Sequence, residues 1–354
     1  MGLHYSDLDD GVLRSFRRGG VIPAHPLALT AAREFDRRRQ RALTRYYLDA
    51  GATGLAVGVH TTQFAIRDAG LFEPVLKAAI EDGRAWTDRP LVMIAGICGQ
   101  SEQAVAEART AVGLGYHAGL VSLSAMKGAS PDELIAHCER VAQEIPIIGF
   151  YMQAAVGGVA LSAGFWERFG RIDNAIGAKV APFDRYKTLD VVRGLVAAGA
   201  EERITLYTGN DDHIVADLLT PFQARRDGEL ITMRFRGGLL GHWSVWTLRA
   251  VQLLERVHAV VESGGAADAD LLALDSRVTD CNGAFFDVAN GFQGCIAGCH
   301  EVLRRQGLLE GIWCLDPDEA LGPGQAAEIS RVCREHPDLA DDSFVKENLE
   351  RWLT

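Results

Sequence analysis

Short apolar runs rich in β-branched residues alternate with longer segments of helical period from about residue 20 to residue 250 of this 354-residue chain. This alternation is typical of repeated strand–helix units around a parallel sheet. Eight runs fit strands, and they cover residues 20–29, 53–59, 90–97, 117–123, 145–152, 175–181, 203–209 and 237–243. Eight units predict an α/β fold of the (β/α)8 barrel type, since no Gly-x-Gly-x-x-Gly follows an early strand to favour a dinucleotide-binding sheet.

Helix signals lie between these runs. Residues 101–115 begin with Ser and close on Gly, and residues 130–146 carry a Ser N-cap, a Pro at the first helical position and a terminal Pro. From about residue 250 the pattern becomes all-helical, and we expect a loose connection at residues 264–276. The sequence therefore predicts a barrel with the catalytic site over residues 1–250 and a C-terminal helical extension over residues 251–354. The extension's helix candidates are residues 246–263, 295–311 and 324–336.

The composition excludes several classes of partner. The net charge of −11 argues against binding to nucleic acid or to an anionic membrane surface, because both need clustered positive charge. The chain has no uncharged apolar run long enough to span a bilayer, and its N-terminus lacks the apolar core of a signal peptide. The seven cysteines are scattered without a secretory context, so we expect reduced thiols and a cytoplasmic location.

One lysine stands out because it interrupts an apolar strand. The chain has only five lysines, and Lys179 alone lies within such a run, NAIGAKVAPFD. An inward-facing ammonium loses hydration, which lowers its pKa and favours the neutral amine that attacks carbonyls. The functional interpretation is a Schiff-base lysine. The alternatives are an ion pair with a buried carboxylate such as that of Asp211, or a strand register that turns the lysine outward.

Other polar residues follow or end neighbouring strands, where barrel enzymes build their sites. Tyr151 lies 28 residues before Lys179 and would place a hydroxyl on the adjacent strand for proton transfer, although the residue taken alone is more typical of a half-buried core tyrosine. Thr61 and Thr62 end the second strand and offer hydroxyls and amides to a carboxylate. His60 and Gly209 are further candidates for contact with a substrate.

Two segments have the residue types of metal sites. Cys295, Cys299 and His300, with Cys314 further on, could suggest zinc, but helical cysteines without a second paired motif are more often buried apolar residues. Residues 210–213, Asn-Asp-Asp-His, could hold a divalent ion or form a helix-capping acidic loop. We expect no metal.

These residues, in this order, resemble the dihydrodipicolinate synthase / N-acetylneuraminate lyase family of class I aldolases. The motifs are PLALT…REFD, YYLDAGATGLAVGVHTTQF, IPIIGFYM, NAIGAKVAPFD, LYTGNDD and a helical tail. The resemblance implies that Lys179 forms a Schiff base with a 2-oxo acid, Tyr151 moves protons, and Thr61 and Thr62 hold the carboxylate. It also implies a barrel that needs no cofactor besides the lysine and that assembles as a homo-oligomer, a tetramer or a dimer.

The sequence departs from the family pattern at several positions. His60 stands where the motif's first Gly would be, and Gln63-Phe64 replace the following Gly-Glu. Residues 152–158 lack the Asn-x-Pro run and the arginine of the lysine-pathway synthase, and residues 122–130 lack its paired tyrosines. A less polar outer pocket is expected, formed by Phe64, Ala125, Met126 and Val156.

The sequence thus predicts a Schiff-base lyase or aldolase that acts on a pyruvate-like 2-oxo acid and a less polar second substrate. Two alternatives remain open. One is a dehydratase of 2-oxo-3-deoxy sugar acids, which needs the same lysine. The other is a catalytically silent barrel that binds a small carboxylic acid.

Overall fold

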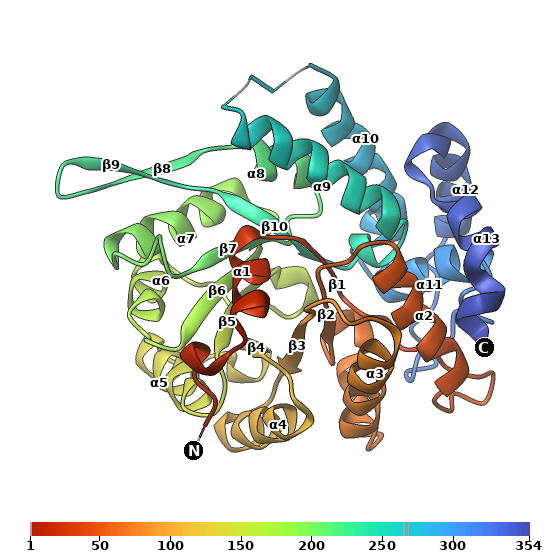
Figure 1. Ribbon diagram of the computed structural model, residues 1–354, viewed down its shortest axis with the longest axis horizontal. Coiled ribbons are helices and arrows are strands. Elements are labelled where there is room, and N and C mark those ends of the chain that lie inside the picture. The colour runs from red at the N-terminus through yellow and green to blue at the C-terminus, as the bar shows by residue number, and fades with distance from the viewer. Residues whose placement is uncertain (1, 265, 268) are drawn as a thin grey trace.

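Eight parallel strands form the centre of the molecule, as the computed structural model shows for residues 2–264, 266, 267 and 269–354 (Figure 1). They follow the order β1-β10-β7-β6-β5-β4-β3-β2, and a parallel bridge between Ala24 and Ala56 joins the two ends. The predicted (β/α)8 barrel and all eight of its strands are confirmed. The strands are β1 Val21–Pro23, β2 Gly54–Val57, β3 Val92–Ile97, β4 Ala118–Val121, β5 Ile147–Met152, β6 Ala175–Ala181, β7 Thr205–Thr208 and β10 Phe235–Leu240.

Helices connect successive strands and surround the barrel (Figure 1). The predicted cap of α5 is present, because Ser130 forms a capping box with Glu133 and Pro131 opens the helix. Helix α4 ends at Gly115, whose φ of +92° only glycine adopts without strain, but the N-cap residue is Gln100 rather than Ser101. These helices are α2 Arg37–Asp49, α3 Phe72–Trp86, α4 Ser101–Leu114, α5 Pro131–Ala142, α6 Ala163–Gly170, α7 Arg185–Ala197 and α8 Ile214–Leu219.

A two-stranded hairpin interrupts the last barrel unit and projects from the body of the molecule (Figure 1). Its strands are β8 Phe222–Arg226 and β9 Glu229–Met233, which pair antiparallel. Asp227 and Gly228 connect them with φ values of +51° and +87°, the backbone geometry that suits a tight hairpin turn. This hairpin is not among the predicted elements, although Asp-Gly between alternating residues is a strong hairpin signal.

Two apolar layers lie on the two faces of the sheet. Residues on the outer face pack against the helices, and alternate residues fill the barrel interior. Helix α1 (Asp10–Arg18) packs Phe16 into the interior cluster, where its ring stacks on Tyr207 with centroids 5.1 Å apart. Because α1 immediately precedes β1, it closes the barrel at the amino ends of the strands, and a site is left to the carboxyl ends.

The C-terminal part of the chain is helical, as expected. Helix α13 packs on α2, and α10 packs on α8 and α12. The loose connection expected at residues 264–276 is wrong from residue 269 onward, where α10 begins, and residues 265 and 268 lie outside the described residues. Helix α9 spans residue 250, and the division of the chain there stays a prediction. These helices are α9 Thr247–Glu262, α10 Ala269–Phe285, α11 Cys295–Arg305, α12 Gln325–Glu335 and α13 Asp342–Leu353.

Within the described ranges, no helix has the length and apolar character needed to cross a membrane.

Candidate active site

Lys179 points into the barrel, as the sequence predicts. It is the fifth residue of β6 and is in register with Phe150 of β5 and Tyr207 of β7, which both belong to the interior cluster. Its neighbours Ala178 and Val180 face the helices instead. The side chain is only 8% exposed, and Nζ lies 4.3 Å from the centroid of the Phe150 ring. The outward register that the sequence left open is therefore excluded.

A cavity of about 70 Å³ lies beside Lys179. Since a water-sized probe occupies roughly 10–15 Å³, this space suits a molecule of a few heavy atoms. Strands β5 and β6, the segments that follow β2, β5, β6, β7 and β10, and the C-terminal part of the chain all contribute to its wall. The lining residues are His60, Thr61, Phe150, Met152, Gln153, Val156, Lys179, Ala181, Phe183, Gly209, Asp211, Gly241, Phe286, Phe292, Cys295 and Ile296.

Burial controls the charge of Lys179. Loss of hydration lowers the pKa of its ammonium to about 8, and the negative charge of Asp211 works in the opposite direction. A larger share of the molecules then carries the neutral amine at pH 7 than for a free lysine. The amine is thus available as a nucleophile without a strong base.

Gly209 lies directly against the lysine side chain. A Cβ atom at this position would be 2.9 Å from Lys179 Cε and 2.8 Å from Ala181 Cβ, both closer than van der Waals contact allows. Gly209 lines the cavity, and its contact with a substrate stays a proposal. It leaves space for the amine arm as well as for a ligand.

His60 and Thr61 lie in the one-turn 3₁₀ helix η2 (His60–Thr62) that follows β2, and both line the cavity. Burial, with a smaller contribution from the Lys179 charge, lowers the pKa of His60 to about 4. The imidazole is therefore neutral at pH 7, with one ring N–H available to donate a hydrogen bond. The positions of His60 and Thr61 match the prediction, and the contact of these two residues with a substrate stays a proposal.

Thr62 lies outside the cavity lining. Its hydroxyl donates to the His25 carbonyl oxygen at 2.7 Å and accepts from the Gly58 N–H at 3.0 Å, and the side chain is fully buried. These bonds tie η2 to the segments after β1 and β2. The expectation that Thr62 faces the substrate is wrong, because its hydroxyl is hydrogen-bonded to the backbone of these segments instead.

Tyr151 also points away from Lys179. Its ring packs on the outer face of the sheet against Trp166, with centroids 5.9 Å apart, and its hydroxyl accepts a hydrogen bond from the Leu161 N–H at 3.2 Å. Phe150, one residue earlier, takes the inward position beside the amine. The expectation of a phenol within reach of Lys179 is therefore wrong. Successive residues of a strand face opposite sides of the sheet, so Tyr151 points outward because Phe150 points inward.

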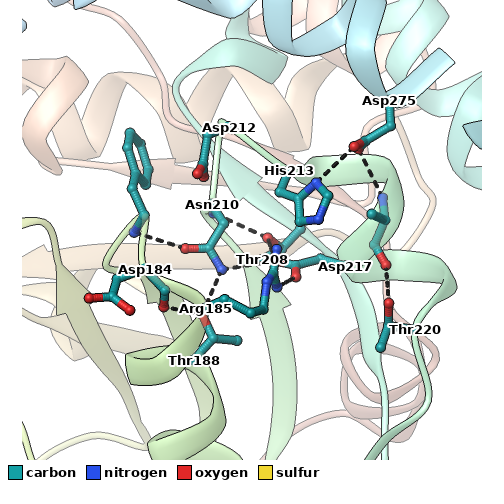
Figure 2. A network of polar contacts seen from close by, with 12 residues as sticks. Asp184, Arg185, Thr188, Thr208, Asn210, Asp212, His213, Asp217, Thr220 and Asp275 are labelled. Atoms are coloured by element: carbon teal, nitrogen blue, oxygen red, sulfur yellow. Dashed lines mark hydrogen bonds and ion pairs between the residues drawn. The ribbon is translucent and has the colours of Figure 1, made fainter. Parts of the chain in front are cut away.

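The loop after β7 is held by a buried polar network (Figure 2). The Asn210 amide nitrogen donates to Asp217 Oδ2 at 2.9 Å and to Thr188 Oγ1 at 3.1 Å. His213 Nδ1 pairs with Asp275 Oδ2 at 2.8 Å, on helix α10. These side chains are turned toward α7, α8 and α10 rather than toward one another, so the loop lacks the convergent ligands of the divalent-ion alternative.

Asp211 lies between these anchored residues and lines the cavity. It is 6% exposed, and its Oδ1 atom is buried without a hydrogen-bond partner among the described residues. Burial raises the pKa of its carboxyl well above the usual value, while the Lys179 charge lowers it. From the sequence, Asp211 is expected only as a partner for Lys179 or as part of a metal site.

The C-terminal part of the chain contributes four cavity residues that the sequence analysis did not place there: Phe286, Phe292, Cys295 and Ile296. No local pattern marks them, because only the tertiary fold brings these segments over the barrel mouth. The zinc alternative for this region is not supported. Cys299 Sγ lies 3.8 Å from the Gly241 carbonyl oxygen, His300 Nδ1 lies 3.9 Å from Cys314 Sγ, and the described residues contain no cluster of three or more metal-ligating side chains.

Searches by sequence find no relatives: no family model matches the chain, and no curated protein does. The structure, however, is similar to solved structures. Dihydrodipicolinate synthase from Oceanobacillus iheyensis has a TM-score of 0.72 at 16% identity, over 93% of this chain and 100% of that one. N-acetylneuraminate lyase from Fusobacterium nucleatum has a TM-score of 0.67 at 16% identity, over 90% and 98%.

A third structure is that of a prophage protein from E. coli K12, described as belonging to the dihydrodipicolinic acid synthase family and determined in complex with pyruvate. Its TM-score is 0.73 at 18% identity, over 90% of this chain and 98% of that one. The chain thus has the fold of these proteins over nearly its whole length. The family named by these structures is the one that the sequence motifs resemble.

Proposed function

We propose that the chain is a Schiff-base lyase or aldolase of the dihydrodipicolinate synthase / N-acetylneuraminate lyase family, and that Lys179 condenses with a 2-oxo acid. The observation that carries the proposal is the buried, inward-pointing amine with a pKa lowered to about 8, beside a small cavity at the carboxyl ends of the strands. The similar structures support it, since one of them was solved with pyruvate.

The chemistry follows from the amine. Its nitrogen attacks the carbonyl carbon of the 2-oxo acid, and loss of water gives an iminium ion. The iminium withdraws electrons from the adjacent carbon, so that a bond there can form or break. Thr61 and the neutral His60 are the proposed hydrogen-bond donors to the substrate carboxylate, and the reaction needs no cofactor besides the lysine.

The second substrate is proposed to be weakly polar. Around the amine, the cavity wall includes Phe150, Met152, Val156, Phe183 and Phe292, and no arginine lines the described cavity. A wall of this kind does not compensate the desolvation of a second carboxylate. Of the four residues expected to make the outer pocket less polar, only Val156 lines this cavity.

Reductive trapping tests the proposal. The protein is incubated with pyruvate or other 2-oxo acids, reduced with borohydride and mapped by mass spectrometry. Adduct mass is expected on the peptide that contains Lys179 and is expected to vanish in Lys179→Arg. Lys187→Arg is the matched control, because Lys187 is a half-exposed lysine paired with Asp184 and its loss leaves the site intact. Labelling that persists in Lys179→Arg would contradict the proposal.

One observation favours a different function, a silent barrel that binds a small acid. Tyr151, the expected proton carrier, faces the helices. The trapping experiment separates the two functions, since a binder that forms no iminium gives no adduct with any 2-oxo acid. The homo-oligomer implied by the resemblance stays a prediction, which size-exclusion chromatography with light scattering measures.

A further inference from the structure

The proposed reaction needs a group that moves protons close to the lysine. Water leaves the first adduct only if its hydroxyl is protonated, and the iminium becomes a nucleophile only if a proton leaves the adjacent carbon. Tyr151 is not in position for either step, and Phe150, which replaces it beside the amine, carries no exchangeable proton. The other titratable groups that line the cavity are the candidates for this role.

Besides Lys179, the described lining contains His60, Asp211 and Cys295 as titratable groups. Burial raises the pKa of the Cys295 thiol to about 12, so it holds its proton throughout the neutral range. Burial lowers the pKa of His60 to about 4, so its imidazole is a weak base at neutral pH. Neither group is suited to give and take a proton near pH 7.

Asp211 differs from both. Burial raises the affinity of its carboxylate for a proton and lowers that of the Lys179 amine, so the two affinities approach each other. An amine and a carboxyl whose proton affinities converge can share a proton between them. A carboxyl group kept neutral by its surroundings can donate, and the carboxylate that remains can accept.

The position of Asp211 also suits it to transfer protons. Its Oδ1 atom is buried in the wall of the cavity without a partner, which is unusual for a carboxylate because the desolvation is not compensated. The neighbouring side chains of Asn210 and His213 are fixed by bonds to Asp217 and Asp275 (Figure 2). The backbone of the loop is thus anchored on both sides of Asp211.

We propose that the Asp211 carboxyl is the catalytic acid and base for the Schiff base of Lys179, in the role that the sequence assigned to Tyr151. This rests on the proposed function. As Nζ attacks C2, Asp211 gives its proton to the carbonyl oxygen and then regains one from the nitrogen, which completes the carbinolamine. Asp211 next protonates the hydroxyl, and water leaves as the nitrogen lone pair forms the C=N bond. The carboxylate finally removes a proton from C3. The C–H electron pair then forms the C2=C3 bond of the enamine, and the π pair of the C=N bond returns to the nitrogen as a lone pair.

Two readouts on the same samples test this assignment. Borohydride trapping with pyruvate reports the iminium, and loss of the methyl proton signal of pyruvate in D₂O, followed by NMR, reports proton removal at C3. In Asp211→Asn the adduct on Lys179 still accumulates on long incubation, but exchange falls by ~100-fold or more. Asp212→Asn and Tyr151→Phe are the controls, and both exchange within about threefold of the wild type.

A second measurement separates a chemical role from a structural one. The Asp211 charge raises the Lys179 pKa, so in Asp211→Asn the pH midpoint of trapping shifts below about 8. A loop that had merely become disordered would expose the amine and shift the midpoint upward. Exchange in Asp211→Asn at the wild-type rate, or its loss in Tyr151→Phe, would overturn the assignment. A wild-type protein that gives no adduct would overturn the proposed function, and the role of Asp211 with it.

Discussion

Replacement of Gly209 by alanine tests whether the position of the lysine arm matters for its chemistry. The added Cβ would lie 2.9 Å from Lys179 Cε and 2.8 Å from Ala181 Cβ, whereas carbon atoms in contact are roughly 3.5–4.0 Å apart. Each of these two distances must therefore increase by about 1 Å. Ala181 is part of β6, so its contact is relieved only by a shift of the Gly209 backbone, and the flexible lysine side chain moves away from the other contact. A displacement of about 1 Å in a reacting group costs on the order of 100-fold in rate.

The assay is the initial rate of borohydride trapping with pyruvate, measured beside a urea unfolding curve. Overpacking of this size lowers the free energy of unfolding by about 1–3 kcal/mol, so Gly209→Ala is expected to remain folded while its trapping rate falls ~100-fold. The matched control is Gly113→Ala in α4, where nothing lies within 4 Å of the new Cβ. Trapping in Gly209→Ala at the wild-type rate would refute the reasoning, because the observed position of the Lys179 side chain would then not be required for the reaction.

Two further predictions concern the same site. The initial trapping rate stops rising above about pH 8, because the buried Lys179 amine loses its proton there; a rate that still rises toward about pH 10, as for an ordinary lysine, would contradict the lowered pKa. Thr62→Val leaves the His25 carbonyl and the Gly58 N–H buried without their partner, and lowers the free energy of unfolding in urea by about 1–3 kcal/mol. Thr61→Val instead weakens the use of pyruvate with little loss of stability. If Thr62→Val instead weakened the use of pyruvate and Thr61→Val lowered the stability, Thr62 rather than Thr61 would face the cavity.

The strand pattern and the lysine could be predicted because each has a local signature. Apolar β-branched runs between helical segments define all eight barrel strands, since each parallel strand is buried on both faces. A charged residue within such a run is costly to bury, so Lys179 is conspicuous in the sequence alone. The β8–β9 hairpin is harder to predict although Asp227-Gly228 signals it, because its two strands interrupt the regular alternation of strand and helix.

The orientation of Tyr151 could not be predicted for the same physical reason that made its strand easy to find. In β5 both faces of the sheet are buried, so the run IIGFYM is apolar throughout and gives no alternation from which to infer which residue points inward. The spacing of 28 residues to Lys179 does not show which face of the sheet Tyr151 is on either, because the pairing of β5 with β6 shifts register between Ile147 and Ile148. The choice between Phe150 and Tyr151 was left to the packing.

The sequence by itself thus determined the barrel and the reactive amine, both of which follow from local patterns of apolar and charged residues. Only the tertiary structure decided which groups surround that amine. Thr62 was withdrawn into the loop by bonds to His25 and Gly58, and Asp211 was brought to the cavity by a loop anchored on three helices. Such positions depend on contacts between segments far apart in the chain, and these contacts leave no periodic trace in the sequence.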